Sequence, residues 1–302
     1  MKKSIFPSLI FILMLAGCGA QTASESQKIN IVASFYPWYE IAVRVGGDLV
    51  KVTNLTPAGA EPHDYEPTPQ DIIALKKARL VIFNGAGLEP WAEKLIPQLE
   101  KDGATTFNAS QNFGDLLHST DSQENYSGLD PHLWLDPLSY KDAVQMVTQK
   151  LASLDPAQKG VYEKNAQKYM QEIDGVHADF ERGLKVCKFR SFVTNHAAFA
   201  YLARRYNLTM VPIAGLSPDA EPSPRELANL ATDVKKLGVK YILVETLVSP
   251  KVAEVLAKEV GAQTLELNPL EGLTPEQISD GKNYISVMKE NLEHLKTALE
   301  CP

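Results

Sequence analysis

Two short segments of the chain each place one histidine among prolines and carboxylates. Residues 61–69 read EPHDYEPTP and residues 129–137 read LDPHLWLDP, although the chain has only 6 histidines in 302 residues. Proline fixes φ and cannot extend a helix or a central strand, so each segment should form a stiff loop that loses little chain entropy when a ligand binds. An imidazole held in such a loop is suited to coordinate a metal ion. His63 and His132 are therefore candidate metal ligands.

A third histidine and a carboxylate would complete such a site. His196 follows the predicted strand 191–194, and ligands of open α/β sheets bind beyond the carboxyl ends of the strands. Glu271 is our choice for the fourth ligand, because it stands in a proline-containing turn after another predicted strand. Three other carboxylates compete with Glu271 for the position of fourth ligand, namely Asp64, Glu66 and Glu245. Any of them could instead orient a ligand imidazole.

The chemistry of this candidate set favours zinc. Three imidazoles and one carboxylate at about 2.0 to 2.2 Å suit tetrahedral Zn²⁺, whereas Mn²⁺ prefers more oxygen ligands. Cu²⁺ and Ni²⁺ would bind the same set as well or better in vitro. A zinc hydrolase needs an open coordination position and a separate general base. Since Glu271 would close the coordination sphere, we expect capture of the ion, with a zinc-dependent hydrolase as the alternative outside binding proteins.

The elements that would carry these residues follow a repeated strand–helix pattern. Short β-branched runs predict strands, and segments with helical spacing predict helices between them. The strands are predicted at 29–34, 50–55, 80–84 and 105–108 in the first half, and at 191–194, 209–212, 241–245 and 264–267 in the second. The helices are predicted at 37–46, 69–77, 197–206, 224–237, 251–260 and 283–299. This alternation is typical of an α/β fold with mainly parallel sheets.

A long amphipathic helix is predicted between the two sets of strands. Asp155 and Pro156 supply an N-cap and a first helical residue. Apolar residues then recur at helical spacing at Val161, Tyr162, Ala166, Tyr169, Ile173, Val176, Phe180 and Leu184. The predicted fold is therefore α/β, with two lobes that each contain a mainly parallel four-stranded sheet flanked by helices, joined by one long rigid helix. The N-terminal lobe would span 29–154, the connecting helix 155–186 and the C-terminal lobe 187–302.

The N-terminus predicts export and attachment to a membrane. Residues 1–17 combine two lysines with an apolar run too short for a permanent transmembrane helix, as in a signal peptide. The run ends at LAGC, which resembles the bacterial lipobox, so Cys18 is expected to carry acyl chains that enter the lipid bilayer. Residues 18–28 are small and polar and would form a flexible tether. We expect a protein anchored on the extracytoplasmic face of the cell membrane.

Cysteine content and charge restrict the class of protein further. With Cys18 assigned to lipid, Cys187 and Cys301 remain in an oxidising compartment, where we expect a disulfide between them, with two free buried thiols as the alternative. The formal net charge is −7, the isoelectric point is about 5.5, and no block of lysine and arginine occurs. This composition argues against a nucleic-acid partner.

Four motifs together resemble the metal-binding solute receptors of ABC importers, a family with zinc and manganese branches. They are EPHDYEPTP at 61–69, DPHLWLDP at 130–137, NHAAFAYL at 195–202 and ETLVSPK at 245–251. The resemblance covers nearly the whole mature chain and implies two α/β lobes, a connecting rigid helix and a metal ion between the lobes. It also implies a receptor that is not an enzyme, that we expect to be monomeric, and that delivers its metal to the membrane permease of an ABC importer.

Within that family, the chain is more similar to the zinc branch. Manganese receptors commonly carry a carboxylate where this chain has His196, and NPLEGL at 268–273 resembles zinc receptors, in which the glutamate matching Glu271 completes the site. Zn²⁺ is therefore the expected cargo, with Mn²⁺ as the alternative. Part of the zinc branch has a long histidine-rich loop in the first lobe. Residues 110–128 contain only His118, so the sequence does not predict a metal-gathering loop here.

Overall fold

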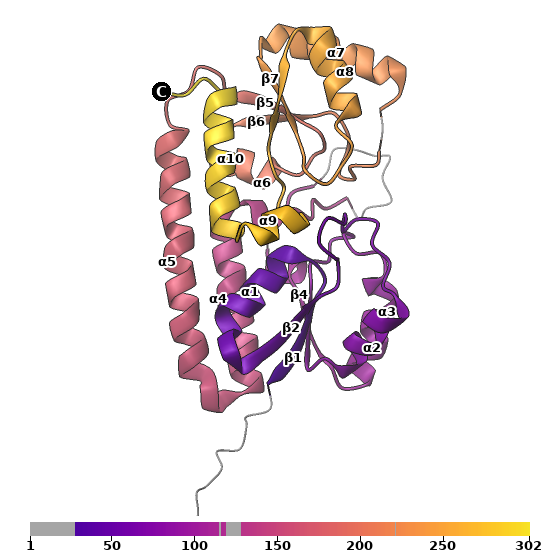
Figure 1. Cartoon of the computed structure of the whole chain (residues 1–302), viewed down its shortest axis with the longest axis vertical. Coiled ribbons are helices and arrows are strands. Elements are labelled where there is room, and N and C mark those ends of the chain that lie inside the picture. Colours follow the sequence, from indigo (N-terminus) through magenta and orange to yellow (C-terminus); the bar gives the residue numbers. More distant parts are fainter. Residues whose placement is uncertain (1–27, 115, 119–127, 221) are drawn as a thin grey trace, which may run out of the picture.

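The computed structural model describes residues 28–114, 116–118, 128–220 and 222–302. Two α/β lobes are stacked end to end along the longest axis of the molecule (Figure 1). The predicted signal peptide 1–17, the acylation site Cys18 and the tether up to residue 27 lie outside the described residues. Within the described part of the chain, no helix has both the length and the apolar character needed to cross a membrane.

Each lobe is built on a parallel four-stranded sheet, and the two sheets have equivalent strand orders. The first sheet has the order β2-β1-β3-β4 and the second has the order β6-β5-β7-β8, with every pair parallel. The strands are β1 (Ile29–Ala33), β2 (Val50–Asn54), β3 (Leu80–Phe83), β4 (Thr105–Asn108), β5 (Ser191–Thr194), β6 (Thr209–Pro212), β7 (Tyr241–Val244) and β8 (Gln263–Glu266). All eight lie within one residue of the predicted bounds, and the predicted fold class is confirmed.

One face of each sheet is covered by helices that belong to that lobe alone. In the N-terminal lobe these are α2 (Pro69–Lys77) and α3 (Ala92–Lys101), which lie beside the sheet in Figure 1. In the C-terminal lobe they are α7 (Pro224–Leu237) and α8 (Lys251–Val260). Each pair of helices closes a separate hydrophobic core, and Val32 of β1 and Val193 of β5 point into these two cores.

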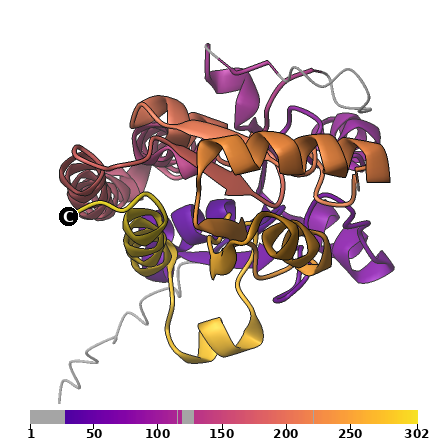
Figure 2. The same ribbon diagram turned by 90° about the horizontal axis from the view of Figure 1, so that it is seen from above.

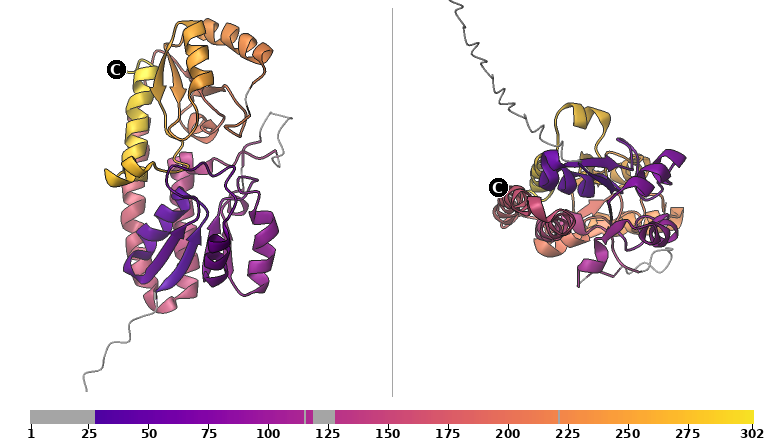
Figure 3. Two further views of the ribbon diagram at one scale, coloured as in Figure 1. Left: turned by 45° about the vertical axis from the view of Figure 1, so that its right-hand side comes forward. Right: turned by 90° about the horizontal axis from the view of Figure 1, so that it is seen from below.

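The opposite faces of both sheets share one continuous hydrophobic core. It contains Ile31 of β1 and Phe192 of β5, together with residues of five helices. These helices are α1 (Tyr36–Gly46), α4 (Pro137–Leu154), α5 (Lys159–Gly183), α6 (Ala200–Arg205) and α10 (Tyr284–Ala298). Figure 3 shows α5 running beside both lobes, with α4 and α10 packed along it. The lobes are therefore joined by packed side chains as well as by the chain itself.

The connecting helix differs from its prediction at the start. Asp155 occupies the N-cap position of a short 3₁₀ turn (Pro156–Gln158), and the α-helix begins only at Lys159. Its 25 residues correspond to a rod of about 37 Å. The predicted apolar face is buried except for Val161, which is 42% exposed. The lobe boundaries at residues 155 and 187 stay a prediction, because α4 and α10 accompany α5 and no single segment separates the lobes.

The remaining elements are short. They are the α-helix α9 (Pro275–Ser279) and the 3₁₀ turns Gly47–Leu49, Ser110–Asn112 and Leu133–Leu135. Helix α6 starts three residues later than predicted, because residues 195–199 form a turn beyond β5.

A disulfide ties the C-terminus to the residues that follow α5. Cys187 and Cys301 are bonded across a sequence separation of 114 residues, and Figure 2 shows the C-terminus beside the end of α5. The structure thus has the predicted bridge and not the two free thiols.

Candidate metal centre

Four buried side chains from both lobes meet at the boundary between the lobes. His63 lies in the loop between β2 and α2, His132 precedes the 3₁₀ turn Leu133–Leu135, His196 follows β5, and Glu271 follows β8. One ligand atom of each residue lies within 4.8 Å of the others, and all four residues are buried. These are the four residues that the sequence singled out as candidate ligands, and the structure brings them together.

Five of the six separations between the four ligand atoms are close to the edge length of a tetrahedral zinc site. Oε1 of Glu271 is 3.4 Å from Nε2 of His63 and 3.3 Å from Nε2 of both His132 and His196. Nε2 of His132 is also 3.3 Å from Nε2 of His63 and of His196. A tetrahedron whose corners lie about 2.0 to 2.1 Å from its centre, as in zinc sites, has edges of about 3.3 to 3.4 Å. These five separations and the donor set therefore agree with a tetrahedral zinc site.

Each clustered histidine donates its backbone N–H to a nearby carboxylate oxygen. The acceptors are Glu61 Oε1 for His63 at 3.0 Å, Asp130 Oδ1 for His132 at 2.9 Å and Glu245 Oε1 for His196 at 3.1 Å. The first two acceptors stand two residues before their histidine, with a proline between. These bonds hold each histidine's main chain in place without help from a metal ion.

Two of these carboxylates also hold the imidazole ring. Nδ1 of His132 is 2.8 Å from Asp130 Oδ1, and Nδ1 of His196 is 2.7 Å from Glu245 Oε1. A carboxylate at Nδ1 keeps the proton on that nitrogen and leaves the lone pair of Nε2 for a metal. The rings are thus oriented with Nε2 towards Glu271.

Burial and charge act on the clustered groups in different directions. Burial lowers the pKa of His63 to about 4, so this ring is neutral near pH 7. Burial also opposes the charge of His196, but the carboxylates of Glu245 and Glu271 outweigh it and raise the pKa of His196 well above its usual value. For Glu271, burial opposes ionisation, yet the imidazoles around it hold its pKa well below the usual range. An ionised carboxylate thus faces the three rings.

The other predicted carboxylates occupy different positions. Glu245 is 7% exposed and supports His196, which is the orienting role considered for it. Asp64 and Glu66 are exposed and are not part of the buried cluster. Their place beside His63 in the sequence does not put them at the site.

Two functional carboxylates were missed by the sequence reasoning, namely Glu61 and Asp130. Both occur in an acid-Pro-His triplet, and that shared spacing was the signal that could have identified them. Oε2 of Glu61 is buried, and no residue in the described part of the chain donates a hydrogen bond to it. Burial, reinforced by the charge of Glu271, raises the pKa of Glu61 to about 10.

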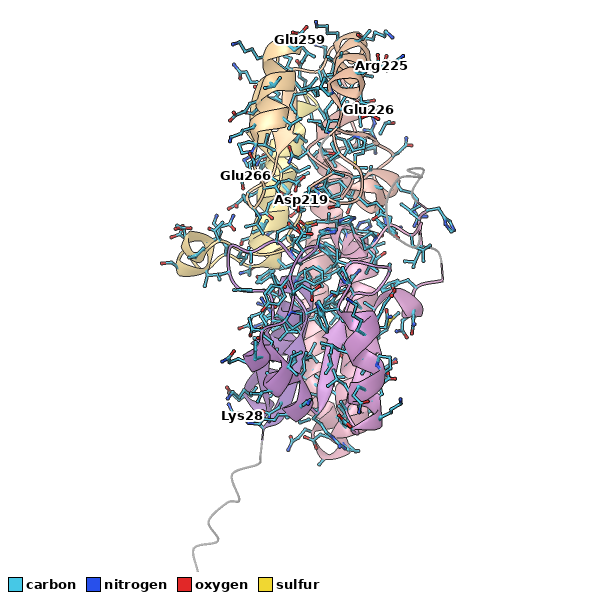
Figure 4. All side chains as sticks on the ribbon, turned by 90° about the vertical axis from the view of Figure 1, so that its right-hand side faces the viewer. Lys28, Asp219, Arg225, Glu226, Glu259 and Glu266 are labelled. Carbon is cyan, nitrogen blue, oxygen red and sulfur yellow. A yellow bond between two sulfur atoms is a disulfide. The ribbon has the colours of Figure 1, made fainter. Side chains whose placement is uncertain are left out.

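A cavity of about 380 Å³ adjoins the site and is lined from both lobes. Its acidic lining residues are Glu61, Asp64 and Asp219. Figure 4 labels Asp219 at the edge of the C-terminal lobe that faces the other lobe. Contact with the Asp219 carboxyl raises the pKa of Asp64 to about 6. The cavity thus places acidic side chains next to the metal centre.

The spare histidines lie away from the cluster. His118 is exposed and forms an isolated antiparallel bridge with Leu129. His177 lies on α5, where its ring contacts Tyr206, and His294 lies on α10. None of the three belongs to the buried group around Glu271.

Comparison with known proteins gives matches over most of the chain. Residues 31–298 match the ZnuA family, described as zinc-uptake complex component A, periplasmic. The high-affinity zinc uptake system protein ZnuA of Bacillus subtilis is 38% identical over 311 residues, which cover 98% of this chain and 97% of that protein. The zinc-binding lipoprotein AdcA of Streptococcus pneumoniae is 39% identical over 308 residues, and the alignment covers 98% of this chain but 61% of AdcA.

The three-dimensional fold is also similar to a solved zinc-bound structure. The Zn(II)-bound ZnuA-like domain of Streptococcus pneumoniae AdcA superposes with a TM-score of 0.78 at 41% identity. The superposition covers 90% of this chain and 99% of that domain. The similarity therefore extends over both lobes.

Proposed function

Because the chain belongs to the ZnuA family of zinc-uptake components, we propose that it captures Zn²⁺ between its lobes and delivers the ion to the membrane permease of an ABC importer. The family consists of zinc-binding receptors for uptake and not of enzymes. The alternative of a zinc-dependent hydrolase is therefore dropped. Binding and release of the ion are the whole activity.

The meeting of His63, His132, His196 and Glu271 in one buried cluster is the observation that carries this proposal. We propose these four residues as the zinc ligands. Five of the six separations between their ligand atoms are 3.3 to 3.4 Å, which matches the ligand separations of tetrahedral zinc. Mn²⁺ prefers more oxygen ligands than one carboxylate supplies, so it is the weaker candidate cargo.

The proposed site is pre-assembled for capture. Burial keeps His63 neutral, and the ionised Glu271 supplies one negative charge against the two of the ion. The carboxylates of Asp64 and Asp219 in the adjoining cavity would raise the local concentration of cations next to the site. Capture then requires loss of bound protons from His132 and His196, whose pKa values are raised.

We also propose that the chain works as a monomer tethered to the extracytoplasmic face of the cell membrane. The proposed anchor is acylated Cys18, which the sequence LAGC supports. The relative AdcA is named a lipoprotein, and the family is described as periplasmic. Mass spectrometry of the membrane fraction would detect the acyl chains, and loss of membrane association in a Cys18→Ala variant would agree with them.

Metal analysis tests the central proposal. The protein is purified without chelator, and its metal content is measured by inductively coupled plasma mass spectrometry before and after exposure to equal amounts of Zn²⁺ and Mn²⁺. We expect one zinc ion per chain and retention of zinc in competition. Preferential retention of Mn²⁺ would show that the manganese alternative is right. Absence of both metals would refute the proposed function as a metal receptor.

A matched pair of variants assigns the site. His132→Ala should weaken zinc binding by at least about 100-fold, because it removes a ligand from a buried set. His118→Ala removes an exposed histidine outside the cluster and should bind zinc as the unmodified chain does.

A further inference from the structure

Trp134 links the two lobes at the metal centre. It lies in the 3₁₀ turn that follows His132, it is fully buried, and its ring centroid is 5.3 Å from that of His132. Its indole Nε1–H donates to the carbonyl oxygen of Pro269 at 2.8 Å, and its own carbonyl oxygen accepts from the hydroxyl of Tyr284 at 2.8 Å. We call Trp134, Pro269 and Tyr284 the Trp134 strap.

The strap ends on the turn that presents Glu271. Pro269 stands two residues before Glu271, and Leu270 between them has a φ of +57°, in the left-handed region that a branched side chain rarely adopts. Such a conformation persists only when the surroundings impose it. Asn268 Oδ1 accepts from the Leu270 N–H at 2.7 Å, and the side chain of Asn291 bonds both the N–H and the carbonyl of Asn268. Trp134 therefore holds the turn from one side while α10 holds it from the other.

The position of this turn sets the distance between two proposed ligands. Oε1 of Glu271 is 3.3 Å from Nε2 of His132, and a metal site tolerates errors of only about 0.2 Å in each ligand distance. His132 is held by Asp130 within its own loop, whereas Glu271 comes from the other lobe. The bond from Trp134 to Pro269 is a direct hydrogen-bonded connection between the segments carrying these two ligands.

We propose that Trp134 is a positioning residue for zinc binding, which holds the Glu271 carboxylate at the correct distance from His132 through the hydrogen bond to Pro269. The inference rests on the proposed function, because it concerns the same ion and the same four ligands. It assigns to a tryptophan outside the ligand set a share of the zinc affinity.

The chain contains a matched control for this role. Trp38 is also fully buried and belongs to the same continuous core as Trp134. Its indole Nε1, however, has no hydrogen-bond partner among the described residues. Replacement of either tryptophan by phenylalanine removes a similar volume, but only Trp134→Phe removes a bond to the Glu271 turn.

The first measurement is the zinc affinity of Trp134→Phe and Trp38→Phe by competition with a chromogenic chelator. We expect Trp134→Phe to bind zinc about 10-fold more weakly, as when a group that supports a metal ligand is lost. Trp38→Phe should stay within about twofold of the unmodified chain. With Co²⁺ in place of Zn²⁺, the visible absorption spectrum should change in Trp134→Phe and not in Trp38→Phe, because it reports the ligand geometry.

A double-mutant cycle with Glu271→Ala separates positioning from general packing. If Trp134 acts through Glu271, then Trp134→Phe should change zinc affinity by less than about twofold once that carboxylate is gone. An equal loss in both backgrounds, or unmodified zinc affinity in Trp134→Phe, would overturn the inference. Failure of the unmodified chain to bind zinc would instead refute the proposed function.

Tyr284→Phe provides a second variant if Trp134→Phe does not fold. It removes only the hydroxyl that bonds the Trp134 carbonyl and keeps the ring that stacks on Tyr140 at 3.8 Å. We expect a smaller loss of zinc affinity, about threefold, that again disappears in the Glu271→Ala background. A loss of zinc affinity that persists in that background, or no loss at all, would contradict the proposed role of the Trp134 strap in positioning Glu271.

Discussion

The three clustered histidines share a local arrangement in which a carboxylate oxygen accepts the histidine's own backbone N–H. In two cases the carboxylate belongs to an acid-Pro-His triplet, and in the third it belongs to Glu245, which directly follows the neighbouring strand β7. Because proline fixes its own φ, the acid and the histidine of a triplet have few relative positions available. The bond therefore limits the freedom of the loop before any ion binds, which lowers the entropy cost of binding.

Asp130→Ala tests this arrangement. The substitution removes the acceptor of both the His132 backbone N–H and the His132 ring Nδ1. Loss of such a partner typically weakens metal binding by about 10- to 100-fold, and we expect a loss in that range by isothermal titration calorimetry. Asp142→Ala changes an exposed aspartate on α4 and serves as the control. Equal zinc affinity in the two variants would show that the ligand rings need no support from Asp130.

The raised pKa of His196 predicts that zinc binding releases a proton. The carboxylates of Asp130 and Glu271 raise the pKa of His132 as well, against the effect of burial. The metal-free protein carries such protons at low pH, so the apparent zinc affinity should rise with pH, by about tenfold per unit for each proton released. His63, with its pKa of about 4, contributes no proton between pH 6 and pH 8. Calorimetry in buffers with different ionisation enthalpies measures the number released. A value of zero at pH 7 would contradict this electrostatic description.

At the level of single elements, helix caps fix where the loops of the site end. Helix α2 begins directly after the loop of His63, with Thr68 and Asp71 in a reciprocal capping box. Tyr65 from the same loop also donates to Asp71 at 2.6 Å. The start of the helix and the loop before it are therefore held by one carboxylate.

Thr68→Ala should lower the free energy of unfolding by about 1 kcal/mol, because the cap satisfies a backbone N–H at the start of α2. Urea denaturation followed by circular dichroism measures the change. Thr232→Ala replaces an exposed threonine inside α7 and should be neutral or slightly stabilising, since alanine favours a helix interior. Equal destabilisation by both variants would argue against a specific capping effect.

At the level of the whole molecule, the continuous core between the lobes limits how the protein can move. Tyr140 of α4 stacks on Tyr284 of α10 with ring centroids 3.8 Å apart, and Arg205 forms a two-bonded ion pair with Asp136 across the lobe boundary. Separating the lobes as rigid bodies would expose this core to water, which is costly for apolar surface. Release of a bound ion should therefore involve smaller rearrangements than a full opening of the lobes.

The disulfide joins two cysteines of the C-terminal lobe that are 114 residues apart in the sequence. A double Cys187→Ser, Cys301→Ser variant should lose about 2 to 5 kcal/mol of stability in urea denaturation, the range typical of native disulfides. Zinc affinity should stay within about twofold, since neither cysteine belongs to the metal cluster. An unchanged unfolding midpoint would show that the folded lobe does not depend on the bridge.

Much of the fold was predictable because its signals are local. Strand bounds follow from short β-branched runs such as residues 80–83, and the buried face of α5 follows from apolar residues at helical spacing. The start of α5 was predicted wrongly, since the Asp155–Pro156 signal also fits the 3₁₀ turn that forms there. Val161 is exposed although it fits the apolar pattern, because its neighbours in space and not its sequence position decide burial.

The sequence by itself determined the donor chemistry of the proposed site, because histidine, glutamate and proline keep their chemical properties wherever the chain places them. It thereby indicated three imidazoles, one carboxylate and a preference for zinc. Only the tertiary structure decided which carboxylates support the rings, that Trp134 reaches Pro269, and that one core runs through both lobes. Those features depend on distances between segments far apart in the chain, and so do the pKa shifts of His63 and His196.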